Sequence, residues 1–139
     1  MKAGATRFGY EGVAVTGEGD QERGWVGLSD LTPLGDGAFV VLERDNQIGD
    51  LARVKRLYRV STEGAAPAPA GQPIPVLKKT LMRDLLADLR APGGAVIEKV
   101  EGFAISGGGE AFAVTDNDGV DGASGETQLL RLGQIPAAR

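Results

Sequence analysis

Alternating apolar and polar residues divide most of this chain into short strands. Apolar side chains alternate with small or polar ones, or form short runs between turns, at residues 9–16, 25–31, 39–42, 53–60, 95–100, 102–105, 111–115 and 127–132. The turns between these segments are rich in Gly, Pro, Asp and Asn, and the turn at 33–37 joins its two neighbours as a meander. The pattern predicts a mainly β fold of antiparallel sheets.

One segment has the period of a helix instead. Leucine recurs every four residues from Leu77 to Leu89, and Met82 and Leu86 lie beside the same stripe. This spacing predicts one short α-helix near residues 78–90. Its leucine stripe is expected to face the core or a docking surface.

Composition favours one domain with many turns. The chain has 139 residues, with 22 Gly and 7 Pro against one Trp, two Tyr and four Phe, and no abrupt change in composition. We expect a single domain over residues 1–139 and, within it, a Pro/Ala-rich surface loop at 62–76. A net charge of −4 and the small number of aromatic side chains argue against nucleic-acid and membrane partners.

The residue types that are missing exclude several kinds of chemistry. The sequence has no His and no Cys, so Ser-His-Asp catalysis, Cys-His catalysis and metal sites with imidazole or thiolate ligands cannot be built from this chain. A metal ion would need oxygen ligands, which suit Ca²⁺ or another hard divalent cation. No motif for an organic cofactor occurs.

Two segments repeat one pattern, at residues 34–46 and 105–118. In each, a Gly-rich turn leads into a strand that begins Ala-Phe and is followed by Asp-Asn. The repetition predicts blade-like units with carboxylates at equivalent strand ends. A propeller blade takes roughly 40 to 50 residues and a closed propeller about 4 to 8 blades, so this chain would supply about two to three blade-like units of a partial β-propeller. Open sheet edges in such a piece favour self-association.

Several runs of residues occur in a characteristic order, at 25–29, 41–50, 52–60, 78–81, 84–86, 99–104, 115–122 and 125–128. Together they resemble the bacterial family known as esterase-like activity of phytase, over nearly the whole chain from residue 9 to 133. The resemblance implies a β-propeller-like, exported protein, hence a periplasmic or secreted location, and hydrolysis of phosphate esters. Family members are longer, so the chain resembles a C-terminal portion or a shortened member. Residues 1–9 lack the apolar core of a signal peptide.

An acidic segment near the C-terminus is the main candidate for a metal site. Six acids and no Lys or Arg occur between residues 101 and 130, and a divalent cation relieves the repulsion between converging carboxylates. The candidate ligands are Asp116, Asp118, Asp121 and Glu126, with Asp45 from the first repeat. The alternative is that Asp, Asn and Gly here build a tight solvated turn.

Three further charged residues are candidates for catalysis. Arg44 has the planar fork that suits a phosphate oxygen, whereas its acidic neighbours in the sequence also suit a structural ion pair. Glu43 and Glu101 are candidate acid, base or ligand groups, or structural residues at strand ends. The resulting hypothesis is a metal-dependent phosphoesterase acting on a small phosphate ester. The alternative is a non-catalytic propeller fragment that acts as a binding or scaffold module.

The segment 53–60 is strongly cationic. It carries Arg53, Lys55, Arg56 and Arg59. Such a strand is expected either to attract an anionic substrate or to form a solvated, protected sheet edge.

Overall fold

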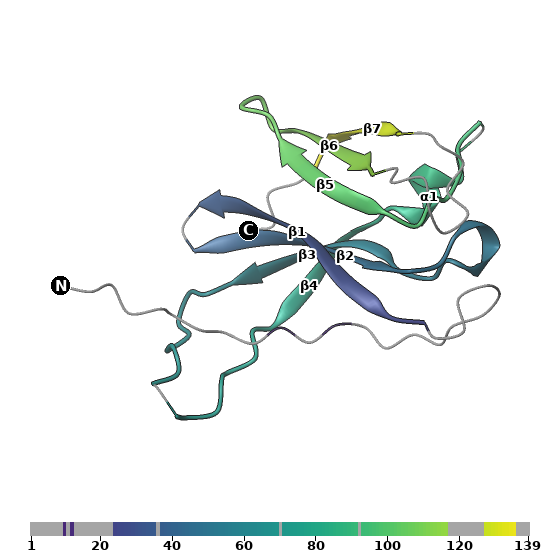
Figure 1. Cartoon of the computed structure of the whole chain (residues 1–139). Helices are drawn as coiled ribbons and strands as arrows, with labels where there is room; N and C mark the ends of the chain where they lie inside the picture. The colour runs from purple at the N-terminus through teal and green to yellow at the C-terminus, as the bar shows by residue number, and fades with distance from the viewer. Residues whose placement is uncertain are drawn as a thin grey trace.

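Two antiparallel sheets make up the fold (Figure 1). The computed structural model describes residues 10, 12, 24–35, 37–69, 71–91, 93–116 and 127–135. The first sheet has the order β1-β2-β3-β4, with strands Val26–Gly35, Ala38–Asp45, Lys55–Ser61 and Lys79–Asp84. The second sheet has the order β5-β6-β7, with strands Val100–Ile105, Glu110–Thr115 and Leu129–Gln134. Two short helices complete the described elements, the 3-10 helix η1 (Gly49–Leu51) and the α-helix α1 (Leu86–Leu89).

Each sheet is an open meander. Every strand pairs antiparallel with the next strand of its sheet along the chain, and among the described residues neither sheet closes into a barrel. The mainly β, antiparallel prediction is confirmed, and the open sheets are consistent with part of a propeller. The two repeated sequence segments occupy corresponding places, because β2 and β6 are each the second strand of their sheet.

A glycine turn sets β1 against β2. Gly35 and Gly37 have φ values of 95° and 73°, in the left-handed region that glycine adopts without strain. A Cβ at Gly37 would lie 2.6 Å from Thr62 Oγ1, whose hydroxyl donates to Gly37 O at 3.0 Å. Position 37 therefore needs glycine both for its conformation and for its contact with the segment after β3.

The apolar core lies between the two sheets. Alternate residues of β2, Val40 and Leu42, belong to it from the first sheet, and Phe103 of β5 belongs to it from the second. The other buried members come from both sheets, the loops and α1: Ala52, Leu57, Leu85, Leu86, Leu89, Val96, Val100, Ala111, Ala113 and Leu132. In Figure 1 the second sheet lies above the first, with α1 at one end. Removal of these apolar surfaces from water holds the sheets together.

Side chains of β1 also bind the backbone of β5. Asp30 Oδ2 accepts a hydrogen bond from Phe103 N at 2.6 Å, and Thr32 Oγ1 donates to Phe103 O at 2.9 Å. β1 and β5 are edge strands of their own sheets, so these bonds satisfy backbone groups that an open edge leaves without a strand partner. The two sheets are thus joined by polar as well as apolar contacts.

The segment predicted to be a helix is largely a strand. A short α-helix does occur within residues 78–90, but α1 spans only Leu86–Leu89, and Lys79–Asp84 forms β4 instead. The reason is tertiary, because β4 completes the ladder along β3 and Leu85 N then donates to Lys55 O at 2.7 Å. The leucine period is therefore divided between two elements. Among the described residues, no helix is long and apolar enough to cross a membrane.

The cationic strand is not a sheet edge. β3 lies between β2 and β4, and Lys55 at its start is fully buried. Arg56 Nε lies 3.1 Å from Asp84 Oδ2 on the neighbouring strand. The expected edge role is wrong for this strand, because β3 has a neighbour on each side. Carboxylates of these neighbouring strands pair with two of its cations, Asp45 with Lys55 and Asp84 with Arg56.

The strand predicted at 95–100 begins only at its last residue. Residues 95–99 are irregular, and the carbonyl groups of Val96 and Glu98 bind elements of the first sheet and its loops. Gly49 N donates to Val96 O at 2.9 Å, and Lys55 Nζ donates to Glu98 O at 2.8 Å. The segment therefore connects the second sheet to η1 and β3.

Two further predicted segments have different outcomes. The strand predicted at 9–16 lies outside the described residues, apart from Tyr10 and Gly12. Residues 62–69 and 71–75 contain no helix or strand, as expected for the Pro/Ala-rich loop.

Candidate functional site

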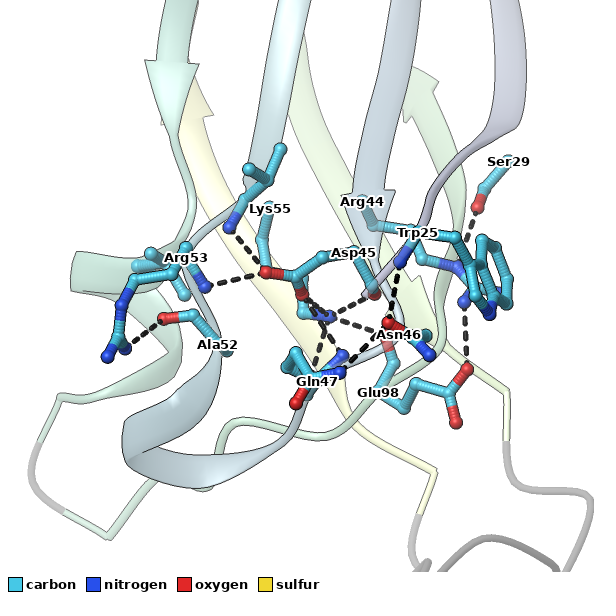
Figure 2. A network of polar contacts seen from close by, with 12 residues as sticks. Trp25, Ser29, Arg44, Asp45, Asn46, Gln47, Ala52, Arg53, Lys55 and Glu98 are labelled. Carbon is cyan, nitrogen blue, oxygen red and sulfur yellow. Dashed lines mark hydrogen bonds and ion pairs between the residues drawn. The ribbon is translucent and has the colours of Figure 1, made fainter. Parts of the chain in front are cut away.

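Charged residues at the end of β2 join residues of the second sheet in one connected cluster. We define the inter-sheet cluster as Arg44, Asp45, Lys55, Glu98 and Glu101. Glu98 links its two halves, because its carboxylate binds Arg44 and its backbone carbonyl binds Lys55. Figure 2 shows this linkage at the ends of the strands.

Lys55 is the most enclosed member of the cluster. Its Nζ donates to Asp45 Oδ1 at 2.8 Å, to Asp45 O at 2.7 Å, to Gln47 O at 3.0 Å and to Glu98 O at 2.8 Å (Figure 2). Both side chains of the Lys55–Asp45 pair are 0% exposed. Burial lowers the pKa of the Lys55 ammonium, while the hydrogen bond to Asp45 and its charge act in the opposite direction. The ammonium is held by four oxygen atoms where β2, β3 and the start of the second sheet meet.

Both oxygen atoms of the Asp45 carboxylate accept hydrogen bonds from donors of the protein. Oδ2 accepts from Arg53 N at 2.6 Å and from Val54 N at 2.8 Å, and Oδ1 also accepts from Gln47 N at 3.3 Å. The sequence predicts Asp45 as a metal ligand, but in this arrangement its carboxylate is fully buried and pairs with the Lys55 ammonium. Oxygen donors of this kind are those that hard cations prefer, so the lysine supplies the positive charge.

Arg44 connects the two sheets through its guanidinium group. Nε donates to Ser29 Oγ at 3.2 Å, Nη1 to Glu98 Oε1 at 2.9 Å and Nη2 to Glu101 Oε1 at 2.7 Å. The Cζ atom lies 4.8 Å from the centroid of the Trp25 ring, over which the guanidinium is stacked. Each of the three nitrogen atoms of the group donates a hydrogen bond, so Arg44 holds Ser29, Glu98 and Glu101 in place. Its predicted contact with a phosphate oxygen stays a prediction.

Glu43 belongs to a separate buried group on the other face of β2. Its Oε2 accepts from Tyr10 Oη at 2.6 Å and from Lys79 Nζ at 2.7 Å. Lys79 Nζ also lies over the rings of Tyr10 and Tyr58, at 4.7 Å and 4.3 Å from their centroids. Burial, followed by the hydrogen bond to Glu43 and its charge, raises the pKa of the Tyr10 hydroxyl. Glu43 therefore ties Tyr10 and β4 to β2 within the first sheet.

Glu101 and Asp116 lie at the same end of the second sheet. Val100 of β5 pairs with Thr115 of β6, and Asp116 N donates to Lys99 O at 2.8 Å, which extends this pairing by one residue. Glu101 is 36% exposed while one of its oxygen atoms is held by Arg44, and Asp116 is exposed. Of the predicted residues that the structure describes, these two combine a carboxylate with access to solvent.

The other predicted metal ligands lie outside the described residues. They are Asp118, Asp121 and Glu126, in the segment 117–126 that follows Asp116. Within the described part of the chain, no three acidic side chains gather in a way that could hold a metal ion. The metal site at Asp116 stays a prediction.

Sequence reasoning missed three residues that organise the site. Glu98 was read as part of a plain strand, Lys79 as part of a helix, and Trp25 only as the start of a strand. The sequence does contain a signal for Glu98, which is a single carboxylate directly after the apolar residues 95–97. Burial of the apolar residues would also bury this charge, and a buried charge needs a partner. For Lys79 and Trp25, the sequence carries no comparable signal.

A separate pocket of about 810 Å³ lies on the outer face of the first sheet. Val41 and Val60 line it, on the face opposite the core residues Val40 and Leu57. Its remaining described lining residues are Tyr10, Leu28, Ser29, Asp30, Leu31, Phe39, Thr62 and Leu77. The pocket is mainly apolar and does not include the inter-sheet cluster.

The fold and the cluster define a mainly β protein of two open antiparallel sheets joined by buried ion pairs. The chain belongs to the phytase-like family described as esterase-like activity of phytase, whose family model matches residues 2–119. The matched region includes the inter-sheet cluster and Asp116, and it ends before Asp121 and Glu126. Comparisons with curated proteins and with solved structures gave no match. The resemblance predicted from the sequence motifs is confirmed.

Proposed function

We propose that this chain takes part in metal-dependent hydrolysis of phosphate esters, with Glu101 and Asp116 at the reacting end. The main support for this proposal is the environment of Glu101. Its carboxylate is partly exposed, and its Oε1 atom lies 2.7 Å from Nη2 of the buried Arg44 guanidinium. Catalysis favours groups that are fixed before the substrate arrives. Membership of the phytase-like family supports the reaction class.

The strand pairing supports a shared role for the two carboxylates. Neighbouring strands of a sheet lie roughly 5 Å apart. Asp116 lies opposite Lys99, and Glu101 is two residues further along the same strand, so both belong to one small region of the sheet end. The acidic segment 117–126 follows directly, and Asp118, Asp121 and Glu126 in it are the further candidate ligands.

A hard divalent cation such as Ca²⁺ fits this donor set, because the chain offers carboxylates and no imidazole or thiolate. When bound, it would polarise a phosphoryl group and hold water near it. Glu101 would act as the base or as an additional ligand. Arg44 would orient Glu101, and Glu43 and Asp45 would maintain the fold.

Calcium binding and turnover test this proposal together. Purified protein is assayed with p-nitrophenyl phosphate and with phytate, in calcium and then in excess chelator, and its melting temperature is measured in both conditions. We expect calcium-dependent turnover and a higher melting temperature with calcium, and a loss of both in Asp116→Asn. The matched control is Glu110→Gln at the other end of β6, where Glu110 pairs with the exposed Arg131. Absence of turnover and of stabilisation by calcium would exclude the metal-enzyme function.

The second candidate function is a non-catalytic binding or scaffold module. The open edges favour it, because β4 and β7 each have one strand partner among the described residues and carry exposed leucines, Leu81 at 50% and Leu129 at 72%. Such edges would pair with further blades, from a second copy or another chain. Light scattering tests pairing with a second copy, since a monomer at all accessible concentrations contradicts edge pairing between copies of this chain. For either function we propose a periplasmic or secreted location, on the basis of the family resemblance.

A further inference from the structure

Trp25 is a rigidly held, partly exposed aromatic side chain. It is the only tryptophan of the chain, and 48% of it is exposed. Its backbone is fixed twice by Asn46, because Trp25 N donates to Asn46 Oδ1 at 3.1 Å and Asn46 N donates to Trp25 O at 3.2 Å. The backbone that carries the indole is therefore already ordered before a ligand binds, which reduces the entropy cost of binding.

The strand beneath Trp25 leaves room for the indole to lie flat. A Cβ at Gly27 would be 2.8 Å from the indole Cζ3 atom, closer than real side chains approach. Gly27 pairs with Arg44 in the register of β1 and β2, and the Arg44 guanidinium lies against the indole. Figure 2 shows Trp25 beside this guanidinium. The indole is therefore supported on the protein side while part of its surface remains in contact with water.

The same guanidinium also fixes Glu101. The Arg44 Cζ atom is 4.8 Å from the Trp25 ring centroid, and Arg44 Nη2 is 2.7 Å from Glu101 Oε1. The Trp25 ring and the partly exposed carboxylate of Glu101 therefore both contact the Arg44 guanidinium. Indole offers apolar contact, and the carboxylate accepts hydrogen bonds.

The local charge indicates what kind of molecule suits this surface. Arg44 carries one positive charge, and both Glu98 and Glu101 bind it, so the group as a whole carries an excess negative charge. A densely phosphorylated ring would be repelled. A neutral ring that carries hydroxyl groups suits it better, because its hydroxyls can donate to Glu101 while its C–H face packs on the indole.

We propose that Trp25 and Glu101 form a subsite for the neutral ring of a sugar, which makes the substrate class a sugar phosphate monoester. The inference rests on the proposed function for the position of the phosphate, next to Asp116. The sugar ring would lie on Trp25, and Glu101 would accept hydrogen bonds from its hydroxyl groups. Trp25 is then a specificity residue for the alcohol part of the ester.

Because Trp25 is the single tryptophan of the chain, its fluorescence emission reports ligand binding at this subsite directly. The protein is titrated in chelator with methyl β-D-glucopyranoside as a neutral ring, with glycerol as an open-chain polyol and with phytate as a densely phosphorylated ring. We expect a saturable change in emission with the glucoside alone, with a dissociation constant on the order of millimolar for so small a ligand. No saturable change with the glucoside, or an equal response to glycerol, overturns the proposal.

Variants assign the binding to the two residues. Glu101→Gln is expected to weaken glucoside binding about tenfold, because a hydrogen bond to a charged acceptor becomes one to a neutral acceptor. Trp25→Leu is expected to abolish binding, observed by saturation-transfer NMR on the glucoside. Leu31→Ala, an exposed apolar residue of the same strand region, is the control and should bind as the parent does. Binding that survives Trp25→Leu contradicts the assignment.

The results distinguish this inference from the function on which it rests. Glucoside binding without hydrolysis of any ester leaves a sugar-binding surface and removes the phosphoesterase function. Calcium-dependent hydrolysis without glucoside binding supports the enzyme and removes the sugar subsite.

Discussion

Lys55 and Asp45, on neighbouring strands, form an ion pair from which solvent is excluded. Nζ and Oδ1 are 2.8 Å apart, and both side chains are fully buried. The same ammonium binds the carbonyl groups of Gln47 and Glu98. One lysine therefore ties β3 to the segment after β2 and to the residues that lead into the second sheet. The pair is the structural centre on which the position of Arg44 and Glu101 depends.

Removing one member of this pair should destabilise the fold strongly. Lys55→Met leaves the Asp45 carboxylate buried without its cation, and Asp45→Asn leaves the ammonium without its anion. Each should lower the free energy of unfolding by about 3–5 kcal/mol, measured by urea denaturation. The double variant should lose less than the sum of the two single losses. Arg131→Gln, at an exposed ion pair, is the control and should change stability by less than about 1 kcal/mol. A loss below about 1 kcal/mol in both buried variants would contradict this account.

Tyr10 should make the fold sensitive to alkaline pH. Its pKa is raised above the usual 10.0 by burial and by Glu43, so above pH 10 the unfolded chain loses a proton that the folded chain keeps. The folded state then binds more protons, and the free energy of unfolding falls as the pH rises. This contribution is fully present below pH 10. Tyr10→Phe should remove it, which urea denaturation of both proteins from pH 8 to 11 would detect. Lys55 titrates in both proteins, so its effect cancels in the comparison, and equal pH slopes would show that Tyr10 is not held as described.

Gly27→Ala should displace the indole without unfolding the protein. The new methyl group meets the outer part of the Trp25 ring, and the partly exposed indole has to shift outward to make room for it. We expect a loss of stability below about 1 kcal/mol, together with a shift in tryptophan emission and weaker glucoside binding. Emission and binding identical to those of the parent would mean that Gly27 does not position the ring. The matched control is Gly49→Ala, in η1, where an added Cβ meets nothing within 4 Å. Since Gly49 has a φ of 52°, its substitution measures backbone strain without contact with the indole.

Charges on the open edges should reduce self-association. Leu81→Lys on β4 and Leu129→Lys on β7 place a cation on each outer strand, which discourages pairing between sheet edges. We expect the apparent mass in light scattering to fall toward that of the monomer in the double variant. An unchanged mass would place any association elsewhere on the surface.

Local patterns predicted the strands because alternation is a property of neighbouring residues. The segments 39–42 and 111–115 became β2 and β6 with small changes at their ends. The short helix predicted near residues 78–90 is present but spans only Leu86–Leu89, because leucine spacing is also local, whereas the ladder between β3 and β4 is not. Period alone cannot show that a segment will complete a sheet.

The sequence predicted which residues belong to the candidate site better than it predicted which of them form ion pairs with one another. Arg44 binds Glu98 and Glu101, which are 54 and 57 residues away, and no sequence pattern joins such distant positions. Asp45 was chosen as a metal ligand because it ends a strand, yet its partner is Lys55, ten residues further on. Both residues were singled out beforehand. What the sequence could not show is that folding brings them together and excludes water between them.

In the proposed calcium-dependent phosphoesterase, Glu101 is the oriented carboxylate that solvent can reach. The most direct measurement is the rate of p-nitrophenyl phosphate hydrolysis at saturating calcium by the parent, Glu101→Gln and the control Glu110→Gln. At a temperature at which all three proteins are folded, we predict turnover by the parent that chelator abolishes, a loss of roughly 10²-fold or more in Glu101→Gln, and no loss in the control. Equal rates for the parent and Glu101→Gln, or no hydrolysis by the parent in calcium, would contradict the account.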